Sequence, residues 1–369
     1  MSTSSTPRGL ALADTVPSSA PGGRPRPRWL SSGTAGALIY VVAALAIFFG
    51  GSDNLLYQGA LVAIYAIVTV SQEWLFGRAG LVSLGPAAIM AVGAFTTARL
   101  SEHGWGVFPV PLLVSFVFGC VIGLLIGIPG LRFSGLYLML TTLALQFIVS
   151  FAAQKYQGLD HLAGFSVEPA HWGSLDLSTP QAMFAISAVI LGLVLAGLYA
   201  LYRGVPGRIW NAIRQDEAAA SVLGVNLVRW KLTAFVGSSA LTAVGGSLYA
   251  YQAAQVTYAS YSLELSLALV VMVFIGGVGT LTGPVLGALV IVLLPLGVDQ
   301  LAGTLSGSGD LASWLTLHQA VLANAIYGLV LLLVLLFERD GIFGLLRRLA
   351  RAVVALARRL RPETEGGSR

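Results

Sequence analysis

Long apolar runs separated by short polar stretches dominate this chain. Runs of about 18 or more apolar residues are typical of helices that cross a lipid bilayer, because about 20 helical residues span its hydrocarbon core. The pattern predicts about ten such segments, and we expect an all-α, polytopic bundle of transmembrane helices. The segments are 34–51, 54–74, 80–100, 108–128, 134–153, 180–202, 231–253, 264–279, 283–299 and 317–337.

Three of these segments leave their path through the membrane open. Segment 80–100 contains Gly85-Pro86, and proline removes a backbone donor and ends or bends a helix. Such breaks occur in membranes where protein or a water-filled cavity satisfies the freed backbone groups. Segments 264–279 and 283–299 are short and joined by IGGVGTLTGP, so they form either full spans or a re-entrant hairpin.

The two ends of the chain differ in composition from its middle. Residues 1–33 are rich in Ser, Pro, Gly and Arg and predict a disordered tail before a transmembrane domain at 34–337. In the closing tail, 338–369, apolar triplets alternate with arginines. This pattern favours a basic helix lying on an anionic lipid surface, which makes membrane lipid an expected partner.

Composition and charge support a membrane protein and orient it. The chain is 56% hydrophobic and 10% charged, whereas soluble domains carry about 25% charged residues. With the N-terminus inside, all but two of the 21 Lys and Arg residues fall on the cytoplasmic side, the exceptions being Arg99 and Lys155. Basic residues accumulate on that side, so we expect both termini in the cytoplasm. The net charge of +5 then requires no nucleic acid partner.

A charged island, residues 207–232, interrupts the apolar pattern on the predicted cytoplasmic side. Its periodicity predicts one helix from Arg208 to Leu223, with Gly224 as the C-terminal cap. Ile209, Ile213, Ala220 and Leu223 would share one face of it. Such a helix would lie along the membrane surface, either as an ordinary basic loop or as a binding surface for another protein.

The chemistry-bearing residues favour a protein without its own ATPase or metal site. No GxxxxGK[ST] loop is present, and the four histidines lack the spacing of metal ligands. We expect no cofactor, no catalytic residue and no enzyme activity, although a membrane enzyme using His161 and His171 is a remote alternative. A passive channel is another. Glu73 and Glu264 lie at segment ends, and this lack of buried carboxylates at span centres counts against a proton-driven transporter.

Five ordered motifs resemble the permease subunits of branched-chain amino acid ABC importers. The island continues as GRIWNAIRQDEAAASVLGVNLVRWKLTAFVGSSALTAVGGSLYA, which is similar to the cytoplasmic loop and following span of that family. The other four motifs follow the expected order: GLVSLGPAAIMAVGAFTTA at 80–98, GLYLMLTTLAL at 135–145, IGGVGTLTGPVLGALV at 275–290 and GLVLLLVLLFERDGIFG at 328–344.

The resemblance implies a permease in a bacterial-type plasma (inner) membrane, driven by ABC ATPase subunits. Its partners would be those ATPases, a second permease subunit and an external substrate-binding protein. The loop 204–230 would contain a coupling helix that docks on the ATPase. The implied ATPase-coupling residues are Arg214, Asp216, Glu217, Ala218, Ala219 and Gly224.

The motifs specify the cargo and its path through the protein less closely than they specify the family. From motif position, the candidate translocation-path residues are Ser83, Thr141, Thr142 and Gln146. Pro86 stands where the family commonly has a histidine, and the loop 154–164 lacks the family's glycine-rich run. Branched-chain amino acids are the expected cargo. Urea, short amides and sugars are the alternatives among related importers.

Overall fold

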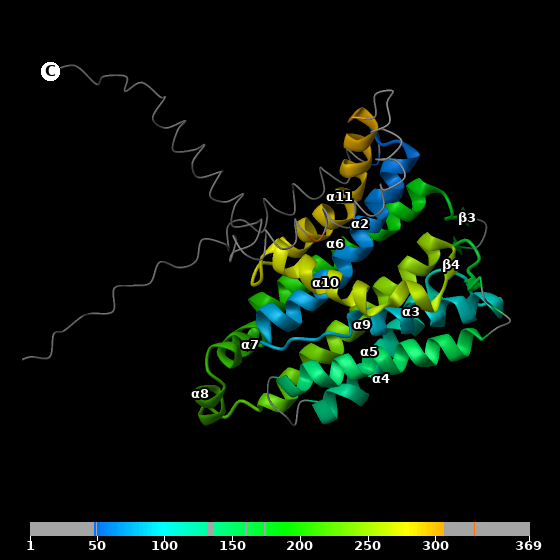
Figure 1. The fold of residues 1–369 in the computed structure, drawn as a ribbon. Helices are drawn as coiled ribbons and strands as arrows, with labels where there is room; N and C mark the ends of the chain where they lie inside the picture. The colour runs from blue at the N-terminus through cyan, green and yellow to red at the C-terminus, as the bar shows by residue number, and fades with distance from the viewer. Residues whose placement is uncertain are drawn as a thin grey trace, which may run out of the picture. The chain divides into compact units, whose positions relative to one another are not determined.

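The computed structural model describes residues 48, 50–130, 136–158, 161, 163–172, 175–305 and 328 (Figure 1). All of them belong to one compact unit, Ala44–Arg369. The predicted tails at 1–33 and 338–369, the segment 317–337 apart from residue 328, and most of 34–51 lie outside the described residues.

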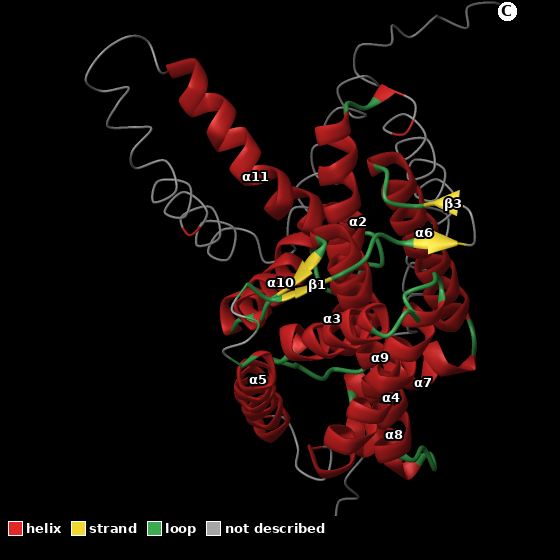
Figure 2. Ribbon diagram, turned by 90° about the vertical axis from the view of Figure 1, so that its right-hand side faces the viewer, coloured by secondary structure: helices red, strands yellow, loops and turns green. Residues whose placement is uncertain are grey.

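The described residues are mainly helical, with one short strand pair beside α10 and another beside α6 (Figure 2). The helices are α2 (Asp53–Glu73), α3 (Pro86–Glu102), α4 (Val110–Gly130), α5 (Leu136–Gln157), α6 (Pro180–Arg203), α7 (Val205–Gln215), α8 (Glu217–Val222), α9 (Leu227–Ala253), α10 (Leu263–Gly276) and α11 (Gly283–Leu305). A π-helix, η2 (Trp74–Arg78), continues α2, and a 3-10 turn, η3 (Tyr258–Tyr261), precedes α10. The strands β1 (Phe165–Ser166) and β4 (Gln255–Val256) pair antiparallel, as do β2 (His171–Trp172) and β3 (Leu175–Asp176).

Five of the described helices are long and apolar enough to cross a membrane. They are Asp53–Arg78, Val110–Gly130, Tyr137–Gln157, Pro180–Arg203 and Leu227–Ala253, and each matches a segment predicted from the sequence. The helical membrane architecture is therefore supported, whereas the count of about ten is not confirmed. Helix α3, with 17 residues, and α10, with 14, are shorter. A 14-residue helix is about 21 Å long, less than the hydrocarbon core of about 30 Å.

The interrupted segment 80–100 is a helix only in its second part. Helix α3 begins at Pro86, which occupies the first helical turn, where a missing N–H costs no helical hydrogen bond. The preceding residues Gly80–Gly85 run without helical structure into the protein. The short segments after it, α10 and α11, pack against each other as a hairpin joined by residues 277–282.

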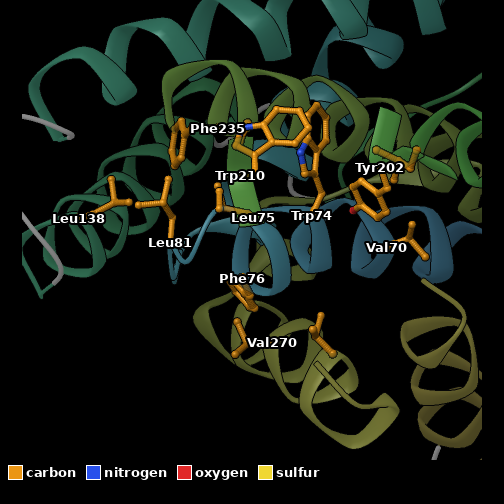
Figure 3. Packing of buried hydrophobic residues seen from close by; sticks show 14 residues of the cluster. Val70, Trp74, Leu75, Phe76, Leu81, Leu138, Tyr202, Trp210, Phe235 and Val270 are labelled. Carbon is orange, nitrogen blue, oxygen red and sulfur yellow. The ribbon is translucent and has the colours of Figure 1, made fainter. Parts of the chain in front are cut away.

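Helix α9 forms the centre of the bundle and packs against α2, α3 and α4. Its tightest contact is with α3, where the backbone of Gly246 lies directly against the backbone of Met90. Small residues allow such close approach between helices in lipid, where packing rather than water exclusion drives association. The buried core extends from α9 to the base of α2, where Trp74, Trp210 and Phe235 lie together (Figure 3).

The predicted single helix of the charged island is wrong. It is two helices, α7 and α8, separated at Asp216, whose backbone is extended (φ −159°, ψ 109°). The reason is local: the Asp216 carboxylate accepts hydrogen bonds from the N–H groups of Ala218 and Ala219, at 2.9 and 3.1 Å. Aspartate competes with the helix in this way and starts a new one. Leu223 consequently leaves the buried face of Ile213 and is 80% exposed.

We expect that Gly246→Ala destabilises the protein, because a Cβ at this position overlaps the backbone of Met90. Overpacking of this kind costs about 1–3 kcal/mol. The matched control is Gly197→Ala in α6, where a Cβ meets no atom within 4 Å. Thermal unfolding in detergent measures both variants. Equal transition temperatures for the two would contradict the packing argument.

Candidate coupling site and translocation path

The short helix α8 lies at one end of the described bundle, between α7 and the start of α9 (Figure 1). Its residues are exposed apart from Ala220, which is buried and faces the protein. Val222 and Leu223 are 86% and 80% exposed, although both are large and apolar. Two adjacent apolar side chains this exposed on a projecting helix form a surface suited to contact with another protein.

Two of the predicted coupling residues set the ends of α8. Asp216 caps its N-terminus through the hydrogen bonds to Ala218 and Ala219. Gly224 follows its C-terminus with φ +83°, a left-handed conformation that glycine adopts without steric cost. The N–H of Val225 donates to the carbonyl of Ala220 at 3.2 Å, which closes the turn. The predicted cap at Gly224 is therefore confirmed, on a shorter helix.

Glu217 holds α8 against α9. Its Oε2 lies 2.7 Å from Nζ of Lys231, in an ion pair in which the lysine side chain is 11% exposed and the glutamate 53%. The lysine has left water, so this pair is screened less than one on an open surface. The predicted coupling residue Glu217 therefore contacts the protein's own α9, while Ala218 and Ala219 remain on the exposed side.

Arg214 points away from α8 and toward the base of α2. Its guanidinium donates a hydrogen bond to the carbonyl of Gly77 in the π-helix. The sequence placed Arg214 with the α8 residues, and the structure separates it from them because the helix breaks after Gln215. Five of the six predicted coupling residues therefore lie in or beside α8, whereas Arg214 is an exposed residue of α7 whose guanidinium bonds at the base of α2.

Helix α7 is anchored by residues that sequence reasoning missed. The Trp210 Nε1–H donates to the carbonyl of Trp230 at 2.9 Å, and its ring meets that of Trp74 edge-on, with centroids 5.2 Å apart (Figure 3). The Arg78 guanidinium donates to Asn211 Oδ1 at 3.2 Å and lies 4.5 Å from the ring centre of Tyr202. In the sequence, only the amphipathic spacing of Trp210 and Ile213 indicated that this side of α7 packs against the protein.

Glu73 is buried at the base of α2, with 1% exposure. Its Oε1 accepts a hydrogen bond from the N–H of Gly279, at 2.7 Å, in the loop between α10 and α11. The sequence placed this carboxyl group at a segment end and predicted no such burial. A position at the boundary of an apolar run does not indicate which distant loop covers it.

Three of the four translocation-path candidates are buried around the start of α3. Thr142 Oγ1 accepts from the N–H of Leu84 at 2.9 Å, and Gln146 Oε1 accepts from the N–H of Ala88 at 2.8 Å. Ser83 is buried beside them, whereas Thr141 is partly exposed and donates to its own helix at the carbonyl of Tyr137.

Gln146 also binds two neighbouring elements. Its Oε1 accepts from the Ser266 hydroxyl at 2.9 Å, and its Nε2 donates to the carbonyl of Tyr261 at 2.8 Å. Ser266 in turn accepts from the N–H of Ala87 at 3.0 Å. Side chains of α5 and α10 therefore cap α3 inside the protein, as an interrupted membrane helix requires.

The two histidines of the remote enzyme alternative have other partners. The ring of His161 lies against Phe165, with centroids 4.6 Å apart, and Nδ1 of His171 lies 3.2 Å from the carbonyl of Pro169. Within the described part of the chain, no group of three or more His, Cys, Asp or Glu residues could hold a metal ion. The described residues of this loop therefore present no metal centre.

Comparison with known proteins identifies the family. A family model described as the permease component of the branched-chain amino acid transport system matches residues 54–335. The chain belongs to this family. The family and the five apolar helices indicate a multi-pass inner-membrane protein, and the proteins it resembles are named as transport permeases.

The relatives of this chain are named for the transport of different compounds. The high-affinity branched-chain amino acid permease LivM of Escherichia coli is 28% identical over 69% of this chain and 65% of its own length. The autoinducer 2 import permease LsrC of an Enterobacter strain is 30% identical over 66% of this chain and 79% of its own. The ribose import permease RbsC of Haemophilus influenzae is 25% identical over 69% and 81%.

The chain spans 65% of the length of LivM, slightly less than two thirds. No solved structure matches the chain.

We expect that Gln146→Leu destabilises the permease more than Thr141→Val does. Leucine leaves the N–H of Ala88 and the carbonyl of Tyr261 buried without their partner, and each such group costs about 1–3 kcal/mol. Thr141 on the same helix loses only a bond within that helix. Thermal unfolding of the two purified variants checks this. A Gln146→Leu protein as stable as the wild type, but defective in uptake, would instead favour a direct role in the path.

Proposed function

We propose that the chain is a translocating subunit of an ATP-driven importer and that α8 docks on a separate ATPase subunit. The observation that carries this proposal is the projecting helix α8, with Val222 and Leu223 exposed beside the small residues Ala218 and Ala219. Small side chains permit close approach of a partner, and two exposed apolar residues supply a contact that loses water on docking.

The attachment of α8 suits transmission of force. Its two ends are capped, Glu217 pairs with Lys231, and α7 is held by Trp210 and Arg214. A push on α8 would consequently reach the transmembrane helices as a rigid-body displacement rather than bend a loose loop. The sequence has no phosphate-binding loop of its own, which is consistent with ATP hydrolysis in a partner chain.

We propose branched-chain amino acids as the cargo, delivered by an external substrate-binding protein. The family description and the similarity to LivM support this choice. A second permease subunit would complete the path, and both termini would lie in the cytoplasm with α8. A related importer cargo is the second candidate, because LsrC and RbsC, named for autoinducer 2 and ribose import, also resemble the chain, at 30% and 25% identity.

We expect that the double substitution Val222→Glu, Leu223→Glu abolishes co-purification of the ATPase and reduces ATP-dependent uptake in vesicles at least about tenfold, because charge replaces the apolar contact. The control is Trp105→Glu in the loop after α3, outside the membrane-crossing helices, where a large apolar residue is also exposed, at 66%. That control should retain ATPase binding. Uptake by the wild-type permease without any ATPase would refute the importer assignment.

We expect that Glu217→Lys weakens ATPase docking by placing two lysines together and releasing α8 from α9. Adding Lys231→Glu restores an opposite pair in reversed orientation, so the double variant should regain most of the docking affinity. Co-purification of each single and double variant, as a double-mutant cycle, measures the coupling. If the reversal does not recover docking, Glu217 contacts the ATPase directly rather than through α9.

A further inference from the structure

Four residues from three parts of the chain meet at the base of α2. They are Glu73, Gly77, Arg214 and Gly279, which we call the α2-base cluster. Glu73 and Gly77 belong to α2 and its π-helical extension, Arg214 to α7, and Gly279 to the loop joining α10 and α11. The four residues therefore connect the coupling region with the α10–α11 hairpin, which follows it by about 60 residues in the chain.

Direct contacts fill this cluster. Glu73 Oε1 accepts from the Gly279 N–H at 2.7 Å, and Arg214 donates to the Gly77 carbonyl. A Cβ on Gly77 would overlap the Glu73 carboxyl group, and a Cβ on Gly279 would lie 3.7 Å from Nη1 of Arg214. The arginine thus borders both the π-helix and the hairpin loop. Neither glycine could carry a side chain without moving a neighbour in this cluster or straining the loop backbone, which has φ +94° at Gly279.

Helix α2 holds the hairpin at a second point on the same face. Thr69 lies one helical turn before Glu73, and its hydroxyl shares its one proton between the carbonyl of Pro284, at 3.3 Å, and that of Ala66 in its own helix, at 3.2 Å. Residues four apart lie above one another on a helix, so this face of α2 carries both contacts. The hairpin loop has positive φ angles at Gly277 and Gly279 and also forms hydrogen bonds of its own through the Thr280 hydroxyl.

Burying the carboxyl group of Glu73 costs desolvation free energy, although this group holds the hairpin loop. Its Oε2 is buried and accepts no hydrogen bond from any residue that the structure describes. Oε1 does have a partner, so an apolar residue here would leave the N–H of Gly279 without its acceptor, whereas Oε2 adds a desolvation cost with no hydrogen bond to offset it. Residues that lower the stability of the folded protein are found mainly where function requires a particular geometry.

We infer that Glu73 is a positioning residue that joins α7 to the α10–α11 hairpin, so that a displacement of the coupling helices reaches the hairpin through the α2-base cluster. The transport consequence rests on the proposed function. The mechanical link does not, because it is built from this chain's own contacts. Glu73 touches no cargo in this role; it acts through Gly279 and Gly77.

Hydrogen exchange on the full-length permease in lipid nanodiscs, without partners, tests the link itself. The variants are Glu73→Leu, which keeps the side-chain volume but removes the acceptor, and Glu73→Gln, which keeps an acceptor for Gly279. Arg214→Met breaks the cluster from the exposed side and avoids a risk to folding. The control is Ser71→Ala, which removes another buried hydrogen bond of α2, to Thr242 at 2.9 Å, outside the cluster.

We expect Glu73→Leu to speed exchange about tenfold or more in both 205–215 and 275–284, since a lost bond of this kind changes local opening by that factor. Arg214→Met should speed exchange in 275–284 although it lies on α7. Glu73→Gln should stay close to the wild type, and Ser71→Ala should change neither segment. A change confined to one segment, or an equal effect of Ser71→Ala, would overturn the link.

Transport by the assembled complex tests the consequence. We expect Glu73→Leu to retain the ATPase subunit but to move about tenfold less cargo per ATP hydrolysed, with Glu73→Gln recovering most of the ratio. A merely structural defect would reduce assembly and leave that ratio unchanged, which would overturn the inference. If the wild type binds no ATPase, the proposed function fails, and the exchange experiment still decides whether the link exists.

Discussion

The need to satisfy every backbone group inside a membrane protein is the constraint on which the rest of this structure depends. The chain breaks a transmembrane segment before Pro86 and buries the start of α3. Lipid offers no hydrogen bonds, so the freed N–H groups must find partners in the protein. Gln146 and Ser266 supply them from α5 and α10, and Thr142 supports the residues just before the break. These contacts fix how α3, α5 and α10 lie relative to one another.

The same constraint gives the polar residues of the helices two competing interpretations. A neutral side chain at depth can line a path or complete a hydrogen bond within the protein, and the second use contributes about 0.6–2 kcal/mol in lipid. Gln146 uses both ends of its amide within the protein, whereas Thr141 on the same helix stays partly exposed. A path residue needs a side that is free for cargo. By that criterion, Thr141 fits the predicted role of a translocation-path residue better than Gln146 does.

The coupling region shows how a short surface helix becomes part of a rigid body. Asp216 and Gly224 end α8 at defined residues, Glu217 fastens it to α9, and Arg214 fastens α7 to the π-helix. The exposed apolar residues Val222 and Leu223 are thereby left as the outward surface. In the proposed function, neighbouring residues of one motif would therefore divide two tasks, with some attaching α8 to the protein and others left free to contact a partner.

The sequence alone indicated the five long apolar helices, the break before Pro86 and the turn at Gly224, because apolar run length, a missing N–H and a left-handed backbone are local properties. The motif order likewise indicated the family. Only the tertiary structure decided that Glu217 pairs with Lys231 and that Glu73 is buried against Gly279, 206 residues away. Nothing in the run around Glu73 specifies that partner. The cost of burying its carboxyl group is set by whichever loop packs over it, and that packing depends on the whole bundle.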